Sequence, residues 1–153
     1  MEMGLQGQRV VVTGAASGIG LATARAFLAE GSSVMICDTD AQALADLAST
    51  DPSLLSARCD VSDRAEVGKF FEEALERFGG LDTLVNNAGI AGPTGPVDEI
   101  APEDWDHCLS VCLTGQFNCT RLAVEALKAS TNNDLEAQLA LEARLQGVCD
   151  TLV

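Results

Sequence analysis

The chain has 153 residues, of which 47% are hydrophobic and 21% are charged, a balance that is typical of a globular domain and excludes a disordered chain. The formal net charge of −14 argues against a nucleic-acid partner, because an acidic surface repels a phosphate backbone. No apolar run is long enough to span a bilayer, and the first ten residues lack the regions of a secretory signal, so we expect a cytoplasmic protein.

The first patterned segment is the apolar, β-branched run RVVVTG, which predicts a buried strand over 9–14. Residues 18–31 follow with apolar side chains at helical spacing. This predicted helix ends at Gly31, where a left-handed residue commonly closes a helix. The first two elements are therefore a strand and a helix joined by a glycine-rich turn.

The alternation continues along the chain. Residues 33–38 form a second predicted strand, and Thr39 or Asp40 can cap a helix over 41–49. A third strand is predicted over 54–61.

Ser62 is the predicted cap of a helix over 63–78, which Gly79 and Gly80 terminate. Residues 81–89 form a fourth strand and its exit loop. Right-handed crossovers then predict an α/β fold with a doubly wound parallel sheet, Rossmann-like, in the order 3-2-1-4. A ligand crevice is expected between the first and fourth strands.

Helices dominate the rest of the chain. Pro102 suits the first turn of a helix over 103–113, and helical spacing continues over 115–130. The segment TNND then interrupts the pattern, and residues 135–153 carry a stripe of leucine and valine that predicts one further helix. The apolar face of that tail could cover its own chain or pair with another copy, and the sequence leaves both possibilities open.

The six cysteines predict no disulfide framework in a cytosolic chain. Cys108 and Cys112 share a helix face beside His107, but a structural zinc site needs four ligands and no second pair is present. We therefore expect the cysteines to act as small hydrophobic residues and expect no metal site. A cysteine-based redox or metal protein is an alternative with no support beyond the cysteine count.

The stretch TGAASGIG has the chemistry of a phosphate-binding turn. Gly14 allows a tight exit from the strand, Gly18 allows close approach of a pyrophosphate, and Gly20 allows the helix to pack near the sheet. Asp38, roughly twenty residues further on, can accept hydrogen bonds from ribose hydroxyls and would repel a 2′-phosphate. With no Lys or Arg in GAASGIG or CDTDAQ, the expected cofactor is NAD; a helix-capping role for Asp38 and a simple turn at the glycines are the alternatives.

Three motifs in order, TGAASGIG, CDV at 59–61 and NNAG at 86–89, resemble the short-chain dehydrogenases/reductases over about residues 7–128. The resemblance implies an NAD(H)-binding oxidoreductase. The cofactor-binding residues that it implies are Gly14, Ser17, Gly18, Ile19, Gly20, Asp38, Asp60, Val61, Asn87, Ala88 and Gly89. Ordinary turn chemistry is the alternative explanation for the two asparagines.

The chain departs from the family where the chemistry is done. Family members use a tyrosine, a lysine four residues later, a serine and an asparagine, and this chain contains no tyrosine. Cys112 replaces the asparagine, and no strand with a serine follows Ser130. We therefore predict no catalytic residues in this chain and little or no hydride transfer by the chain alone, because a proton donor with a tuned pKa is missing.

Two units are expected: a Rossmann NAD-binding domain over 1–128, incomplete after the cofactor-binding half, and a divergent helical tail over 129–153. The alternative function is an interaction or regulatory protein. It would pair with a full-length relative, or with itself, through an exposed edge at the fourth strand and the terminal helices.

Overall fold

A computed structural model describes residues 4–130 of the chain. Four parallel strands form one sheet in the order β3-β2-β1-β4. The strands are β1 (Arg9–Thr13), β2 (Ser33–Asp38), β3 (Leu55–Arg58) and β4 (Thr83–Val85). The predicted doubly wound sheet and its strand order are thus confirmed.

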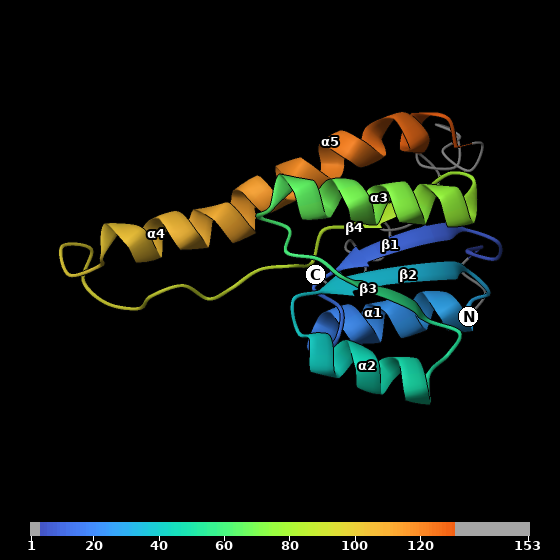
Figure 1. Cartoon of the computed structure of the whole chain (residues 1–153), viewed down its shortest axis with the longest axis horizontal. Coiled ribbons are helices and arrows are strands. Elements are labelled where there is room, and N and C mark those ends of the chain that lie inside the picture. The colour runs from blue at the N-terminus through green and yellow to red at the C-terminus, as the bar shows by residue number, and fades with distance from the viewer. Residues whose placement is uncertain (1–3, 131–153) are drawn as a thin grey trace, which may run out of the picture.

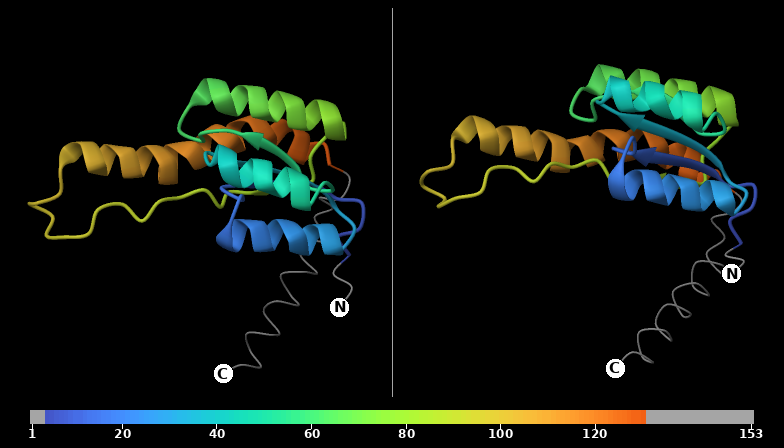
Figure 2. Two further views of the ribbon diagram at one scale, coloured as in Figure 1. Left: turned by 60° about the horizontal axis from the view of Figure 1, so that its bottom comes forward. Right: turned by 90° about the horizontal axis from the view of Figure 1, so that it is seen from below.

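Helices cover both faces of the sheet (Figure 1). On one face lie α1 (Gly18–Ala29) and α2 (Ala41–Thr50), and on the other lie α3 (Arg64–Phe78) and α5 (Gly115–Lys128). Two further views show the same three layers (Figure 2). Each face has its own buried cluster, because alternate residues of a strand point to opposite sides. Val10 and Ile36 belong to the α1–α2 side, whereas Val11 and Met35 belong to the α3–α5 side.

Helix ends follow the predicted capping chemistry except in one case. Asp40 caps α2 by accepting from the N–H groups of residues 42 and 43, and Gly31 and Gly79 both have positive φ after α1 and α3. The predicted cap of α3 was wrong: Asp63, not Ser62, accepts from the first N–H groups of that helix. Ser62 instead donates to Asp60 at 2.7 Å, so its hydroxyl is not available as a cap.

Strands β3 and β4 are shorter than the sequence predicted. After Arg58 the chain turns through Asp60, whose carboxylate accepts the N–H of Ser62 at 2.9 Å. After Val85 the backbone N–H of Asn87 donates a hydrogen bond to the Val85 carbonyl at 3.1 Å. Local hydrogen bonds therefore end both strands and direct the following residues over the carboxyl end of the sheet.

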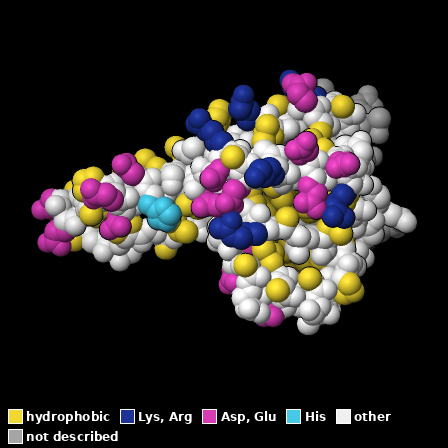
Figure 3. All heavy atoms as spheres, viewed as in Figure 1, with side chains coloured by type: hydrophobic (Ala, Val, Ile, Leu, Met, Phe, Trp, Pro, Cys, Tyr) yellow, Lys and Arg dark blue, Asp and Glu magenta, His cyan; other side chains and the backbone are white. Residues whose placement is uncertain are grey.

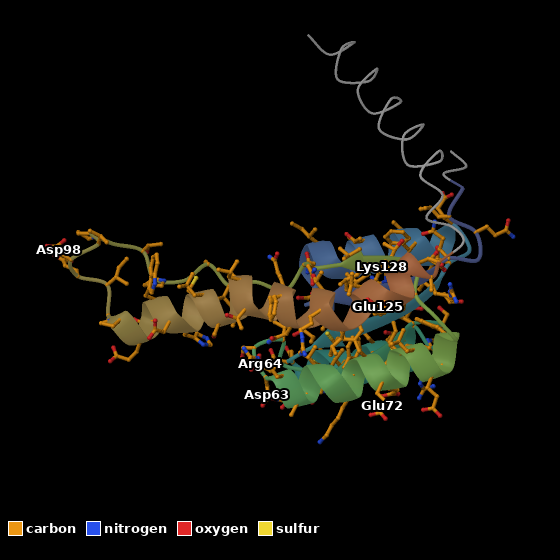
Figure 4. All side chains as sticks on the ribbon, turned by 90° about the horizontal axis from the view of Figure 1, so that it is seen from above. Asp63, Arg64, Glu72, Asp98, Glu125 and Lys128 are labelled. Carbon is orange, nitrogen blue, oxygen red and sulfur yellow. The ribbon has the colours of Figure 1, made fainter. Side chains whose placement is uncertain are left out.

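Residues 91–114 extend away from the sheet as an arm, which consists of a loop, α4 (Pro102–Leu109) and the π-helical segment η1 (Ser110–Thr114). Pro102 occupies the first turn of α4, as predicted. Figure 4 places Asp98 at the tip of the arm and Asp63 and Arg64 at the start of α3. Helix α5 continues from η1 and brings the chain back onto the sheet.

A charged contact joins the start of the sheet to the end of α5. The Asp82 carboxylate accepts from the backbone N–H of Arg9 at 2.8 Å and from its Nε and Nη2 at 2.8 and 2.7 Å. The hydroxyl of Ser130 donates to the same carboxylate. Arg9 and Ser130 thereby hold the pKa of Asp82 well below its usual range, the Arg9 hydrogen bond being the main cause.

Strand β4 is the edge of the described sheet, as expected, but its three residues are half-buried rather than open. Within residues 4–130, no helix has both the length and the apolar character needed to cross a bilayer. The predicted helix over 135–153 and its apolar stripe lie outside the described residues, so they stay predictions.

Candidate dinucleotide-binding groove

The turn from β1 into α1 needs glycine for two separate reasons. Gly14 has a φ of +61°, and a Cβ there would lie 2.6 Å from the Cα of Ala88. Gly18 has a φ of +57° and open space around it. Gly20 has an ordinary φ, but a Cβ there would lie 2.5 Å from Asn87 Nδ2 and from the Gly14 carbonyl oxygen. The roles inferred from the sequence for Gly14 and Gly20, a tight exit and close helix packing, agree with this geometry.

Helix α1 begins with unsatisfied donors. Its cap residue Ser17 is extended and makes no side-chain hydrogen bond to the helix, and the first intrahelical bond is donated by Leu21 to the Ser17 carbonyl. The N–H groups of the first turn have no acceptor within the helix. Together with the helix dipole they favour an anion in front of the turn. Ile19 is 80% exposed at this end, so its side chain is not part of the hydrophobic core.

Asp38 ends β2 with its carboxylate held in place by two backbone donors. Its Oδ2 accepts from Ala16 N–H at 3.0 Å, and its Oδ1 accepts from Asp40 N–H at 3.1 Å. The first bond ties the carboxylate to the glycine-rich turn across the sheet. Asp40 is the cap of α2, so capping does not account for Asp38. Each carboxylate oxygen can accept a further hydrogen bond.

Asp60 and Val61 follow β3. The two hydrogen bonds from Ser62 to Asp60 Oδ1 orient that carboxylate and are the main cause that lowers its pKa, so it is ionised at neutral pH. Val61 is buried against Gly115 of α5, where a Cβ would lie 2.6 Å from Val61 Cγ2. Its carbonyl accepts from the Asn118 side chain at 3.0 Å. This packing fixes the Asp60–Val61 segment against the second helical layer.

The segment after β4 is anchored by a residue that sequence reasoning missed. The hydroxyl of Thr13, which is buried, accepts the N–H groups of Asn87 and Ala88, each at 3.1 Å. The Asn87 side chain donates to the carbonyls of Thr13 and Gly14 at 3.0 and 2.7 Å. The motif TG of the turn was visible in the sequence, but nothing indicated that its threonine holds the distant NNAG segment.

Asn86 behaves differently from Asn87. Its Nδ2 donates to the Thr120 hydroxyl of α5 at 3.0 Å, while its Oδ1 is buried with no hydrogen-bond partner among the described residues. The two asparagines thus join β1, β4 and α5 rather than forming only a local turn.

These segments surround a groove of about 510 Å³ at the carboxyl end of the sheet. It lies over the ends of all four strands, and so it is wider than the crevice between β1 and β4 that the sequence predicted. The sequence-predicted residues that line it are Gly14, Ser17, Asp38, Asp60, Val61, Asn87, Ala88 and Gly89. Gly18, Ile19 and Gly20 do not line it and lie in the first turn of α1 beside it. The lining residues that sequence reasoning missed are Thr39, Arg58, Cys59, Ile90, His107 and Val111.

Cys112 joins the arm to the segment that leaves the groove. Its sulfur accepts the N–H of Ile90 and donates to the Ile90 carbonyl, both at 3.3 Å. Cys108, one turn earlier, lies under Gly92, where a Cβ would be 2.9 Å from the sulfur. No cluster of three or more metal-ligating side chains exists within residues 4–130. The cysteines described here are free thiols with structural contacts.

The comparisons with known proteins agree with this geometry. The family model for short chain dehydrogenases matches residues 8–134. The chain belongs to the short-chain dehydrogenase family. It is 44% identical over 126 residues to (5R,7aS)-5-hydroxy-7a-methyl-1-oxo-2,3,5,6,7,7a-hexahydro-1H-indene-carboxyl-CoA reductase of Mycobacterium tuberculosis, covering 78% of this chain and 48% of that protein. It is 37% identical over 144 residues to L-fucose dehydrogenase of Oryctolagus cuniculus, covering 93% of this chain and 51% of that protein.

A solved structure shows the same fold. The crystal structure of a short chain dehydrogenase from Mycobacterium smegmatis superposes with a TM-score of 0.76 at 36% identity, covering 82% of this chain and 55% of that chain. The chain spans about half the length of most of the curated relatives it matches. Membership in this oxidoreductase family implies a nicotinamide dinucleotide, NAD or NADP, as the cofactor.

The residues of this short-chain dehydrogenase chain fit such a group. Gly14 lines the groove with its backbone, and the start of α1 offers N–H donors to a pyrophosphate. Asp38 and Asp60 supply oriented carboxylates at the ends of β2 and β3. Bound there, the cofactor would supply hydride chemistry, while these residues would bind and orient its adenosine half.

Proposed function

We propose that this chain binds NAD(H) through its glycine-rich turn, Asp38 and the segments 60–61 and 87–89. The observation that carries the proposal is the position of the Asp38 carboxylate. It lines the groove, and the N–H of Ala16 holds it against the turn that would bind the pyrophosphate. A carboxylate there accepts from a 2′-hydroxyl and repels a 2′-phosphate, which favours NAD over NADP.

We further propose that the 153-residue chain by itself transfers hydride poorly or not at all. The sequence contains no tyrosine, and Cys112 occupies the position where the family has an asparagine. The sulfur of Cys112 bonds the Ile90 backbone in both directions, so this position supports the groove's wall rather than a proton relay. The proposal extends to a dinucleotide-binding unit over residues 1–128 with a separate tail over 129–153, in a cytoplasmic protein.

Calorimetric titration of the folded chain with NADH tests the cofactor assignment. We expect saturable binding, and we expect Asp38→Asn to weaken it about 10- to 100-fold, because a hydrogen bond to a charged acceptor contributes about 1.5–3 kcal/mol. Asp40→Asn is the matched control: it removes a neighbouring carboxylate that caps α2 and does not line the groove. A folded chain that does not bind NADH, or an Asp38 variant that binds as well as wild type, would overturn the proposal.

A second candidate function is interaction with another chain, a full-length relative above all. It is favoured by the apolar side chains along the arm and the start of α5, namely Trp105, Leu109, Leu113 and Phe117, which are 38–64% exposed. On the face seen in Figure 3, hydrophobic and acidic side chains are both exposed on this arm. Sedimentation of the chain alone and mixed with a full-length relative tests this candidate. Concentration-independent monomers in both samples would refute it.

A further inference from the structure

The glycine-rich turn and the CDTDAQ segment contain no Lys or Arg, but another segment brings a basic side chain to the groove. Arg58, the last residue of β3, is the only Lys or Arg among the described residues that line the groove. In the parallel pairing of β2 with β3, Arg58 is the direct partner of Asp38. Paired residues on neighbouring strands point to the same face, with their strands roughly 4.8 Å apart. The Arg58 side chain therefore starts beside Asp38, whose carboxylate would bind the ribose.

Glu66 holds that guanidinium. Arg58 Nη1 donates to both carboxylate oxygens of Glu66, at 3.0 and 3.1 Å. Glu66 lies in the first turn of α3, and its Oε2 also accepts the backbone N–H of Asp60 at 2.8 Å. The carboxylate is thus fixed by the main chain of the groove wall, and it draws Arg58 toward α3. Figure 3 shows basic and acidic side chains mixed on the body of the molecule, in keeping with such pairing.

NAD and NADP differ in one group on the adenosine ribose. NAD carries a 2′-hydroxyl on the adenosine ribose, and NADP carries a 2′-phosphate there. Asp38 favours the hydroxyl by accepting a hydrogen bond from it and disfavours the phosphate by repulsion. A guanidinium beside Asp38 would favour the phosphate, because its planar N–H donors match phosphate oxygens. Arg58 cannot do this fully while Glu66 neutralises and positions it.

We propose that the Arg58–Glu66 ion pair, at the strand position paired with Asp38, sets how strongly this groove discriminates NAD from NADP. Glu66 would hold away from the ribose the Lys or Arg side chain that, among the described lining residues, could bind a 2′-phosphate. The inference rests on the proposed dinucleotide binding and adds two selectivity residues to it. The pair is half-exposed, with side-chain exposures of 53% for Arg58 and 34% for Glu66. Ion pairs at such exposure are weak, so a phosphate can compete for Arg58 and the discrimination is graded rather than absolute.

Titration calorimetry with NADH and with NADPH tests this on the full 153-residue chain, with circular dichroism to confirm that each variant is folded. Glu66→Gln removes the charge and keeps an oxygen that can accept the Asp60 N–H. We expect it to tighten NADPH binding about 10-fold, as expected for one released charge-assisted contact, with NADH changed less than about twofold. Arg58→Gln should weaken NADPH binding relative to the wild-type chain and so lower the ratio of NADPH to NADH affinity.

Two controls separate this effect from general electrostatics. The double variant Glu66→Gln with Arg58→Gln should lose the gain in NADPH affinity, because the gain acts through Arg58. Glu73→Gln removes one charge from the same helix, where Glu73 pairs with Arg77, and should leave the NADPH-to-NADH ratio unchanged. A Glu66 variant with an unchanged ratio, or a gain that survives in the double variant, overturns the inference while NADH binding still supports the proposed function. A folded wild-type chain that binds neither dinucleotide overturns both.

Discussion

The contact between Arg9 and Asp82 should contribute a large part of this chain's stability. The Asp82 side chain is 1% exposed and accepts from three donors of Arg9 and from Ser130. Asp82→Asn keeps the shape but turns one acceptor oxygen into an N–H₂ group that faces donors. Removal of one partner from a buried pair costs about 3–5 kcal/mol. Because the Arg9 side chain is 29% exposed, we expect the lower end, a loss of about 3 kcal/mol.

Urea denaturation followed by circular dichroism measures this loss at pH 7, with Glu73→Gln as the control. Glu73 makes an exposed ion pair on α3, so its loss should cost under about 1 kcal/mol. A double-mutant cycle with Arg9→Met should show a coupling of about 2 kcal/mol, since the two residues act on one another directly. A loss below about 1 kcal/mol for Asp82→Asn would refute the reasoning.

The same contact sets a pH dependence. The folded pKa of Asp82 lies well below its unfolded value of about 3.9, chiefly because Arg9 donates to it. The unfolded chain therefore binds a proton before the folded one does, and the stabilisation is complete above about pH 5 and declines as the pH falls toward the folded pKa. The stability gap between wild type and Asp82→Asn should be smaller at pH 3 than at pH 7. A gap that does not change with pH would contradict this assignment.

Two further predictions concern the groove and the thiols. Thr13→Val should lower stability by about 1–3 kcal/mol and weaken NADH binding, because it removes the hydroxyl that accepts the Ala88 N–H and leaves the Asn87 N–H with only the Val85 carbonyl. Denaturation and calorimetry measure this, and an unchanged stability would contradict the role of Thr13 in holding residues 87 and 88. Iodoacetamide at pH 8 should label Cys108 and Cys112 before Cys37 and Cys119 in the native protein, since burial keeps Cys119 protonated with a pKa raised to about 12, and the thiol contact with Cys59 together with burial raises that of Cys37 strongly. Mass spectrometry gives the order, and equal labelling rates would refute it.

The sequence by itself determined the layered fold. Strand runs such as RVVVT and SVMICD are buried on both faces and carry no competing pattern, so local propensity and burial agree. Gly14, Gly31 and Gly79 predicted their turns because positive φ values are open to glycine and costly for other residues. The order of the strands followed from the handedness of the crossovers. The position of Asp38 at the end of β2 followed from the apolar run that predicted a strand over 33–38.

Strand ends and caps were less predictable, because neighbouring polar side chains compete for the same donors. Ser62 and Asp63 are both residue types that cap helices well. Asp63 forms the cap of α3 because the Ser62 hydroxyl donates to Asp60 instead. Sequence patterns indicate that a cap is present but do not decide between adjacent candidates.

Only the tertiary structure decided which distant residues meet in the groove. Arg58 and His107 carry no motif, and they line the groove because β3 pairs with β2 and because the arm projects from the carboxyl end of the sheet. Thr13 looks like an ordinary strand residue until the fold places its hydroxyl under the backbone of residues 87 and 88. Local sequence patterns set strands, turns and helix faces through short-range geometry. Contacts between residues dozens of positions apart depend on how those elements pack, and this is why the presence of Arg58 in the groove was visible only in the folded chain.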